Sequence, residues 1–357
     1  MNFDLAKLEK FSLDSLNKNS INSFDFIDGK IISCCESELN IFNLETGIKS
    51  NIYSVVDETE ELGCFKIFQQ DKLFLSNENI IQLFDLNLSQ QINKFKFSKD
   101  TINSIKISKK DNILACCDDS GEIKLLDVRT QSREPCLSFC KSLNQHDNIC
   151  YALEFHPANE HELFSGSFDC TFIKWDIRFQ KKDSKKPFIK KVAVSDEIQK
   201  LIQIEKDGAD MLSSMTPSFI HSLYFIELPE NKTGLMCGTE NGYAMLFDSD
   251  SCKLIHGKQI TNNLAVSQFN KFEKIDDKNL IATSGDSKLI EFIYLNKEQA
   301  NFKNKTHVKF EIRKFEELSI KHGKKVNCVK YKDQKLYLSD TSNDISIYNF
   351  KNLLNKS

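Results

Sequence analysis

The sequence has little glycine, few arginines and no long apolar run. Glycine accounts for 12 of the 357 residues, about half of its average usage, which excludes collagen-like repeats and glycine-rich linkers. No run of about eighteen apolar residues occurs, so we expect no membrane-spanning helix. The opening residues MNFDLAKLEKFSLDS carry acids and lack an apolar segment, so we also expect no secretory signal peptide.

Charge is nearly balanced, and apolar residues are plentiful. Lys and Arg number 48 against 51 Asp and Glu, a net charge of −3, which argues against a globally basic nucleic-acid binder. Hydrophobic residues make up 40% of the chain and include 28 Phe, which excludes an acidic disordered protein. The length would suit two or three domains of about 150 residues, but closed all-β folds often exceed that size as one unit.

Familiar catalytic motifs are also missing. The chain contains no G-x-x-x-x-G-K-[ST], G-x-G-x-x-G, G-x-S-x-G or H-E-x-x-H. His161-Glu162 begins like the last of these, but Ser165 stands where the second His is needed. Asp118 and Asp119 are typical of acids that hydrogen-bond the backbone of a turn. We therefore expect no enzyme activity and no bound cofactor.

The twelve cysteines do not form a disulfide framework. They are scattered through a long chain without a secretory signal, which favours a reduced compartment, the cytoplasm, the nucleus or both. Most lie in strand-like segments, where a buried thiol acts as a small hydrophobe. Cys136, Cys140, His146 and Cys150 offer four zinc ligands, but tetrahedral sites usually have tighter paired spacings. We predict no metal site, and a zinc centre here is the less favoured alternative.

One pattern recurs seven times along the chain: an aromatic or aliphatic residue followed by Asp or Asn. Its copies are IFNL, LFDL, LLDV, KWDI, LFDS, FIYL (with Tyr in the Asp place) and IYNF. Successive anchors Asn43, Asp85 and Asp127 are 42 residues apart, and the later intervals are longer. Before each anchor come three alternating strands separated by polar turns, with a weaker fourth strand in the spacer, as in KLIHGKQI.

Four-stranded units of about 40–45 residues are typical of propeller blades. The sequence therefore predicts an all-β protein, a single seven-bladed β-propeller over residues 1–357. The predicted blades lie near residues 21–50, 62–95, 102–140, 149–178, 220–258, 265–296 and 325–350. Residues 179–219 and 296–322 are predicted as inserted loops.

Three smaller predictions concern the segments outside this pattern. FDLAKLEKF (3–11) is predicted to form the outer strand of the last blade and close the ring, because an open blade edge would expose unpaired backbone groups; a frayed tail is the alternative. The part VSDEIQKLIQIEKDGADML (194–212) has apolar residues at helical spacing and predicts a short helix. The Lys-rich segment KKDSKKPFIKK (181–191) is either a solvated loop or a contact for an acidic partner surface.

Two segments resemble blades of the WD-repeat family. They are DNICYALEFHPANEHELFSGSFDCTFIKWDIR (147–178), with His146 upstream, and INSIKISKKDNILACCDDSGEIKLLDVR (102–129). The resemblance extends over residues 21–350 and implies a WD-repeat β-propeller. It also implies a buried hydrogen-bonded tetrad that fixes the blade rather than a catalytic set. The tetrad residues would be His146, Ser167, Asp169 and Trp175.

Arginine stands out because it is rare. The chain has only four, at positions 129, 133, 178 and 313, against 44 lysines. Two of them, Arg129 and Arg178, follow the third strands of neighbouring blades in L-D-V-R and W-D-I-R. A planar guanidinium can bind a carboxylate bidentately or stack on a ring, which an ammonium cannot do. Both are predicted to emerge side by side on one face; a local salt bridge to the preceding Asp or to an adjacent loop is the alternative.

The motif W-D-x-R is similar to the sixteen-residue box, here LFSGSFDCTFIKWDIR (163–178), of WD-repeat substrate receptors in cullin-RING ubiquitin ligases. That resemblance implies docking onto the propeller adaptor of such a ligase. The protein-binding residues would be Asp127, Arg129, Trp175, Asp176 and Arg178. We therefore predict a non-catalytic interaction scaffold, a monomer within a complex, with no membrane or direct nucleic-acid partner. The alternative is a scaffold subunit of another assembly, for example chromatin- or ribosome-associated, with 181–191 as its contact.

Overall fold

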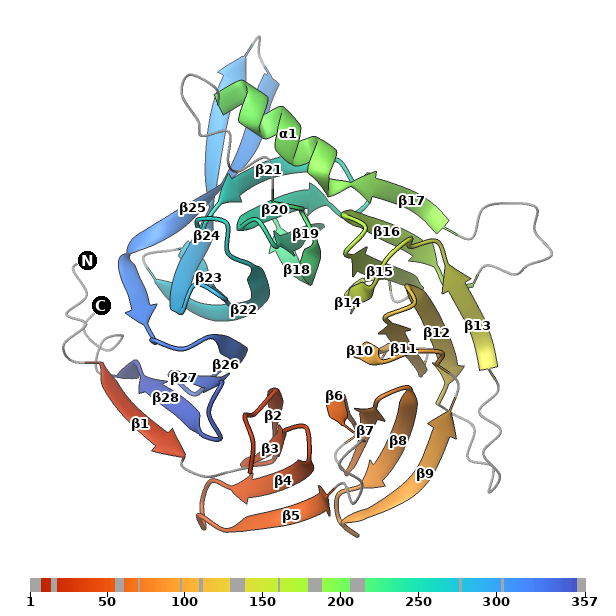
Figure 1. The fold of residues 1–357 in the computed structure, drawn as a ribbon. Coiled ribbons are helices and arrows are strands. Elements are labelled where there is room, and N and C mark those ends of the chain that lie inside the picture. Colours follow the sequence, from red (N-terminus) through yellow and green to blue (C-terminus); the bar gives the residue numbers. More distant parts are fainter. Residues whose placement is uncertain are drawn as a thin grey trace.

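The fold is a ring of β-sheets around a central axis (Figure 1). The computed structural model describes residues 8–13, 18–54, 61–69, 71–96, 98–108, 112–128, 139–159, 161–178, 188–205, 216–275, 278–302 and 305–351. Within these residues the strands form seven antiparallel four-stranded sheets, and consecutive sheets stand side by side around the ring. The predicted seven-bladed β-propeller is therefore confirmed.

In each blade the first strand is innermost and the fourth outermost (Figure 1). Blade one contains β2 (Ser23–Ile27), β3 (Lys30–Cys34), β4 (Glu38–Asn43) and β5 (Lys49–Ser54). Blade two contains β6 (Leu62–Phe68), β7 (Lys72–Asn77), β8 (Ile80–Asp85) and β9 (Gln90–Lys96). Blade three contains β10 (Ile102–Ser108), β11 (Ile113–Asp118), β12 (Glu122–Asp127) and β13 (Phe139–Asn144). Blade four contains β14 (Cys150–Phe155), β15 (Glu162–Ser167), β16 (Thr171–Asp176) and β17 (Phe188–Ala193).

The remaining blades follow the same order. Blade five contains β18 (Ile220–Leu228), β19 (Lys232–Thr239), β20 (Tyr243–Asp248) and β21 (Leu254–Gln259). Blade six contains β22 (Val266–Ile275), β23 (Lys278–Gly285), β24 (Leu289–Phe302) and β25 (Lys305–Lys321). Blade seven contains β26 (Val326–Lys332), β27 (Lys335–Asp340), β28 (Ile345–Asn349) and β1 (Glu9–Leu13). The one described helix is α1 (Val194–Glu205).

The second strand of each blade is buried on both faces, because a neighbouring blade covers each side. In β11 the four residues from Leu114 to Cys117 are all 0% exposed. This explains why these strands read as short apolar runs rather than as alternating patterns. The hydrophobic clusters accordingly lie between blades, as where Cys117 and Leu125 of blade three pack with Leu163 and Trp175 of blade four.

The N-terminal strand closes the ring. β1 pairs antiparallel with β28, from Glu9 opposite Asn349 to Leu13 opposite Ile345. The last blade is thus completed by a segment from the other end of the chain, as predicted. The strand lies at 9–13 rather than 3–11, and residues 1–7 lie outside the described part.

Two segments predicted as inserted loops carry strands instead. Residues 296–322 contain the end of β24 and all of β25, so they form a long hairpin that extends outward and returns as the fourth strand of blade six (Figure 1). The polar run NKEQAN at 296–301 has no apolar alternation, which is why the pattern missed this strand. Likewise 179–219 contains β17, the fourth strand of blade four.

Helix α1 follows β17 directly and confirms the predicted short helix. Its apolar residues Val194, Ile198 and Ile202 are buried with Phe172 of blade four and Phe247 of blade five. The helix therefore seals the outer seam between these two blades (Figure 1). Among the described residues, no helix has the length and apolarity of a membrane-spanning segment.

The scarce glycines include two that the turns between second and third strands require. Gly121 and Gly242 have φ of +78° and +84°, a region that residues with a Cβ adopt only with strain. A Cβ on Gly121 would lie 2.6 Å from the Asn148 oxygen, and one on Gly242 would lie 2.2 Å from the Thr261 oxygen. These turns therefore pack closely against the connection that leads into the next blade.

Candidate functional site

A buried hydrogen-bonded chain organises blade four. The indole Nε1 of Trp175 donates to Ser165 Oγ at 2.8 Å, and Ser165 Oγ lies 2.7 Å from His146 Nε2. On the other side of the ring, His146 Nδ1 is 3.0 Å from Asp169 Oδ2. A carboxylate only accepts, so Nδ1 carries the proton, and Nε2 accepts the Ser165 hydroxyl proton. These hydrogen bonds link the connection before β14 and the β15–β16 turn to strands β15 and β16, and they fix the positions of all four.

The serine in this chain is Ser165, whereas the sequence predicted Ser167. Trp175 stands opposite Leu163 in the β15–β16 register, so Ser165, two residues after Leu163, is the diagonal neighbour of the indole. Ser167 lies four residues after Leu163, about 13 Å further along the strand. Ser167 instead donates to Asn148 O at 3.1 Å and accepts from the Asp169 N–H at 3.0 Å. Both serines are 0% exposed and point to the same face, so the sequence pattern did not separate them.

Asp169 is held ionised by its partners. Burial by itself would raise the pKa of this carboxyl, but hydrogen bonds from His146, Thr171 and the Asp147 N–H outweigh it and hold the pKa far below its usual range. Thr171 Oγ1 donates to Asp169 Oδ1 at 2.6 Å. Lys191, from the Lys-rich segment, also lies 3.4 Å from Asp169 Oδ2. These contacts identify the set as a structural network.

The W-D-x-R motif places one predicted residue in the core and two at the surface. Trp175 is 0% exposed, so its prediction as a protein-contacting residue is wrong: the indole serves the buried chain described above. Asp176 and Arg178 follow it at the end of β16. Arg178 Nε and Nη2 donate to Asp176 Oδ1 and Oδ2 at 2.9 and 2.7 Å, and the Arg178 side chain is 62% exposed.

This bidentate pair is the local salt bridge that the sequence left open as the alternative. The Arg178 hydrogen bond is the main cause of the lowered pKa of Asp176. In blade three, Asp127 ends β12 in the equivalent place and is half-buried. Arg129 lies outside the described residues, so the predicted pairing of two arginines on neighbouring blades stays a prediction.

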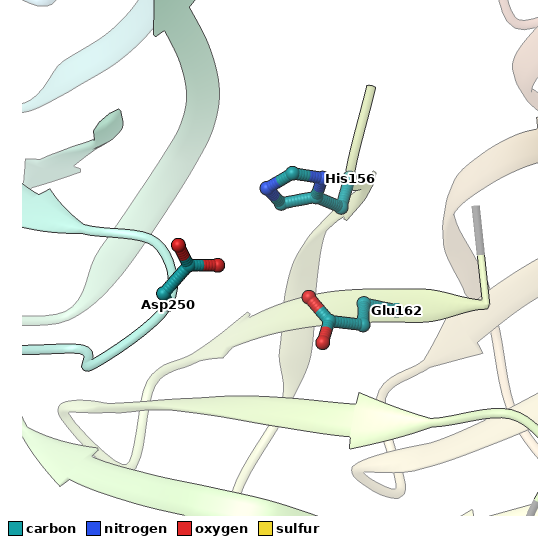
Figure 2. A group of neighbouring side chains, drawn as sticks. All are labelled: His156, Glu162 and Asp250. Carbon is teal, nitrogen blue, oxygen red and sulfur yellow. The ribbon is translucent and has the colours of Figure 1, made fainter. Parts of the chain in front are cut away.

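Three potential metal ligands lie together on the same face as Arg178, between blades four and five. Figure 2 shows His156 after β14, Glu162 at the start of β15 and Asp250 in the turn between β20 and β21. One ligand atom from each lies within 4.8 Å of the others. His156 Nδ1 accepts the N–H groups of Ala158 and Asn159, at 3.2 and 3.0 Å. Burial is the main cause of the lowered pKa of His156.

A lysine already supplies the cation of this cluster. Lys174 is 4% exposed, and its Nζ donates to Glu162 Oε2 at 2.9 Å and to the Ser249 carbonyl at 3.0 Å. The ammonium also lies 5.6 Å from the centre of the Phe164 ring. A divalent cation would have to bind beside this positive charge, which is unfavourable. The cluster therefore acts as a polar brace between blades four and five, which sequence reasoning had not identified.

The alternative zinc set is not assembled within the described residues. Both ring nitrogens of His146 are engaged, with Asp169 and Ser165, and Cys150 is buried in the core between blades three and four. Cys136 and the side chain of Cys140 lie outside what the structure describes.

Blade seven contains a second buried network that sequence reasoning missed. His322 Nε2 donates to Asp340 Oδ2 at 2.6 Å, and the Tyr348 hydroxyl lies 2.9 Å from Nδ1. Tyr348 pairs with Leu336 as Trp175 pairs with Leu163, so a tyrosine stands in the tryptophan position. The available signal was His322 before the last blade, followed by the Asp340 turn and a final aromatic. Blade seven therefore keeps the network with three side chains, without a counterpart of Ser165.

Sequence comparison identifies the repeat. The family model "WD domain, G-beta repeat" matches residues 137–176, which end in blade four. The chain is 26% identical over 296 residues to the "WD repeat-containing protein 53 homolog" of Dictyostelium discoideum, covering 78% of this chain and 77% of that protein. It is 24% identical over 237 residues to the "Histone acetyltransferase type B subunit 2" of Candida glabrata, covering 65% of this chain and 45% of that protein.

Structural comparison agrees on the architecture. A chain of the solved "Crystal Structure of Mitotic Checkpoint Complex" superposes with a TM-score of 0.68 and 12% identity, covering 96% of this chain and 90% of that chain. At this low identity the likeness concerns the fold alone.

Proposed function

The chain is a WD-repeat β-propeller, and from that premise we propose that it is a non-catalytic protein-interaction scaffold, specifically a substrate receptor of a cullin-RING ubiquitin ligase. The adaptor would bind the face on which the third strands end. We call this surface the third-strand face and define it by Asp127, Asp176 and Arg178. A location in the cytoplasm, the nucleus or both is part of the proposal, and the ten described cysteines, all free thiols, support it.

The Asp176–Arg178 pair is the observation that carries the proposal. An exposed ion pair contributes only about 0–1 kcal/mol to stability, so the fold does not need an arginine here. In a chain with four arginines and 44 lysines, this position nevertheless presents a guanidinium held flat by two hydrogen bonds. Prior orientation by Asp176 reduces the ordering cost of binding a partner. The pair is thus suited to recognition by shape as well as by charge.

A second candidate is a scaffold subunit of another assembly, such as one associated with chromatin. The similarity to a histone acetyltransferase subunit favours it. Its contact would be the Lys-rich segment, of which residues 188–191 are described. There Lys190 Nζ donates to the Ser251 carbonyl at 2.6 Å and Lys191 Nζ to the Gln145 carbonyl at 2.9 Å. These two lysines therefore already stabilise their own blade and its neighbour, which favours the first candidate.

Affinity capture from cells tests the proposal. We expect the wild-type chain to recover a cullin-RING adaptor and Arg178→Ala to recover at least about tenfold less, because a central interface arginine can contribute about 2 kcal/mol or more. The double variant Arg129→Ala/Arg178→Ala should lose the rest.

The matched control is Arg313→Ala. Arg313 is also an exposed arginine paired with acids, Glu298 and Glu311, but it lies on the β24–β25 hairpin. Equal adaptor recovery by wild type and by the Arg129→Ala/Arg178→Ala variant would refute the receptor mechanism. Loss of partners only when the lysines of 181–191 are neutralised would establish the second candidate instead.

A further inference from the structure

Aromatic side chains form a stack on the face opposite to the third-strand face. We call Tyr151, Phe168, Phe219 and His221 the aromatic shelf. The Phe168 ring stacks on Tyr151 at 5.3 Å and 23° and on Phe219 at 5.1 Å and 16°. His221 meets Tyr151 edge-on at 5.5 Å and 68°. Tyr151 is the second residue of β14, the innermost strand of blade four (Figure 1), and it is 40% exposed.

The propeller does not require an aromatic residue at Tyr151. This residue is the extra one of a bulge between Cys150 and Ala152. Asn103 and Asn327 occupy the matching bulges of blades three and seven. Their amides tie adjacent blades together: Asn103 donates to the Cys150 carbonyl at 3.2 Å, and Asn327 donates to the Ile21 carbonyl at 3.1 Å. Tyr151 instead meets His221 of the next blade through a ring and leaves 40% of its surface exposed, which points to a role in binding.

Acids occupy the position equivalent to Phe168 in four other blades. In each blade one residue follows directly after the end of the second strand. In blades two, three, five and six that residue is Glu78, Asp119, Glu240 and Asp286, whereas in blade four it is Phe168. We call these four acids the acidic rim. Because every second strand ends on the same face, the rim lies on the face that carries the shelf.

One rim acid contacts the shelf directly, a second is linked to the neighbour of Tyr151 through Asn103, and a third is paired with a lysine. Glu240 is hydrogen-bonded to His221. Asp119 accepts from the same Asn103 amide that reaches Cys150, the neighbour of Tyr151. Asp286 pairs with Lys325 at 2.8 Å. Burial is the main cause of the raised pKa of Tyr151.

We propose that the aromatic shelf and the acidic rim bind an arginine side chain of an extended segment of a partner protein. A guanidinium can stack flat on Tyr151 and donate paired hydrogen bonds to rim carboxylates, which combines the two chemistries found here. The acidic rim disfavours nucleic acid, whose phosphates it would repel. The inference deepens the proposed function, on which it rests, by assigning substrate recognition to the face that the adaptor leaves open.

Saturation-transfer NMR with the purified full chain tests this inference and detects weak binding. The probes are the peptides Gly-Ser-Ala-X-Ala-Ser-Gly, in which X is Arg, citrulline, Lys or Glu. We expect the Arg side chain to receive saturation. Citrulline, which has the same shape without the charge, should bind about three- to tenfold more weakly, and Glu should not bind.

Variants locate the site. Tyr151→Ala should abolish the Arg signal, and Tyr151→Phe should retain it, because stacking needs the ring and not the hydroxyl. Glu240→Gln and Asp286→Asn should each weaken binding about three- to tenfold. Arg178→Ala, on the opposite face, should leave it unchanged. Unaltered fluorescence of Trp175, the single tryptophan, shows that each variant is folded.

Several results would overturn the inference. They are equal binding of the Arg and citrulline peptides, absence of binding by every peptide, full binding by Tyr151→Ala, or stronger binding of a single-stranded RNA oligonucleotide than of the Arg peptide. The assay contains no adaptor. If no Arg peptide binds but adaptor capture is intact, only the role of the aromatic shelf is rejected. If the Arg peptide binds but adaptor capture fails, only the receptor mechanism is rejected.

Discussion

The Ser165 hydroxyl offers the sharpest test of how blade four is held together. Substituting Ser165→Ala removes the acceptor of the Trp175 indole N–H and the donor to His146 Nε2. Both side chains are fully buried, so water cannot replace the lost partner. An unpaired buried polar group costs about 1–3 kcal/mol. With two groups affected, we expect the free energy of unfolding to fall by about 3 kcal/mol.

Ser167→Ala is the matched control. Ser167 is equally buried, but its partners are two backbone groups in less buried turns, the carbonyl of the exposed Asn148 and the N–H of the half-buried Asp169. We expect this variant to lose about 1 kcal/mol. The two variants should differ by about 3 °C in melting temperature, given an unfolding entropy of about 2 cal/mol/K per residue.

Urea unfolding followed by tryptophan fluorescence measures both variants, because Trp175 is the single tryptophan and reports on this blade. Two results would refute the hydrogen-bond chain. One is a Ser167→Ala variant that is as unstable as Ser165→Ala. The other is a Ser165→Ala variant whose free energy of unfolding lies within about 0.5 kcal/mol of wild type, which is roughly the spread of neutral surface changes.

Two further predictions concern buried charge. Lys174→Met should lower the free energy of unfolding by about 3–5 kcal/mol, because it leaves the Glu162 carboxylate, only 14% exposed, without its cation. Adding Glu162→Gln should recover part of the loss, and thermal unfolding that shows no such recovery would contradict the brace. Burial lowers the pKa of His322 despite its bond to Asp340, so the folded state holds this ring neutral. The stability that the neutral, buried His322 ring contributes is therefore present above the ordinary histidine pKa of about 6.5, and it is lost as the pH falls below that value. Unfolding free energies measured between about pH 7 and 5 should fall less steeply for His322→Gln than for wild type, and parallel curves would refute the assignment.

The repeat made the architecture predictable, because each blade restates the same strand and turn pattern. Asn43, Asp85 and Asp127 fixed the period, and the need to protect the open edge of blade seven anticipated β1. The hairpin of β24 and β25 was missed because the run NKEQAN at the end of β24 has no apolar alternation, although the backbone pairing continues through it. The returning strand does alternate, as VKFEI at 308–312, and its Ile312 is buried with residues of blade five.

The site was less predictable, because register decides which side chains meet. Ser165 and Ser167 share a face, and only the pairing of Trp175 with Leu163 selects between them. Tyr151 lies at a bulge, where an extra residue interrupts the period-two pattern. The His221 ring that meets Tyr151 edge-on and the Phe219 ring that stacks on Phe168 both come from the next blade. Such contacts between blades depend on the closed ring and have no signature within one repeat.

The central claim is that partner proteins bind the outer faces of this propeller, with the adaptor on the third-strand face. Hydrogen–deuterium exchange on the natively purified complex tests it most directly. The account predicts slower exchange in the complex than in the isolated chain at the end of β16 and through Arg178. Unchanged exchange there, together with protection of residues 181–191, would contradict it.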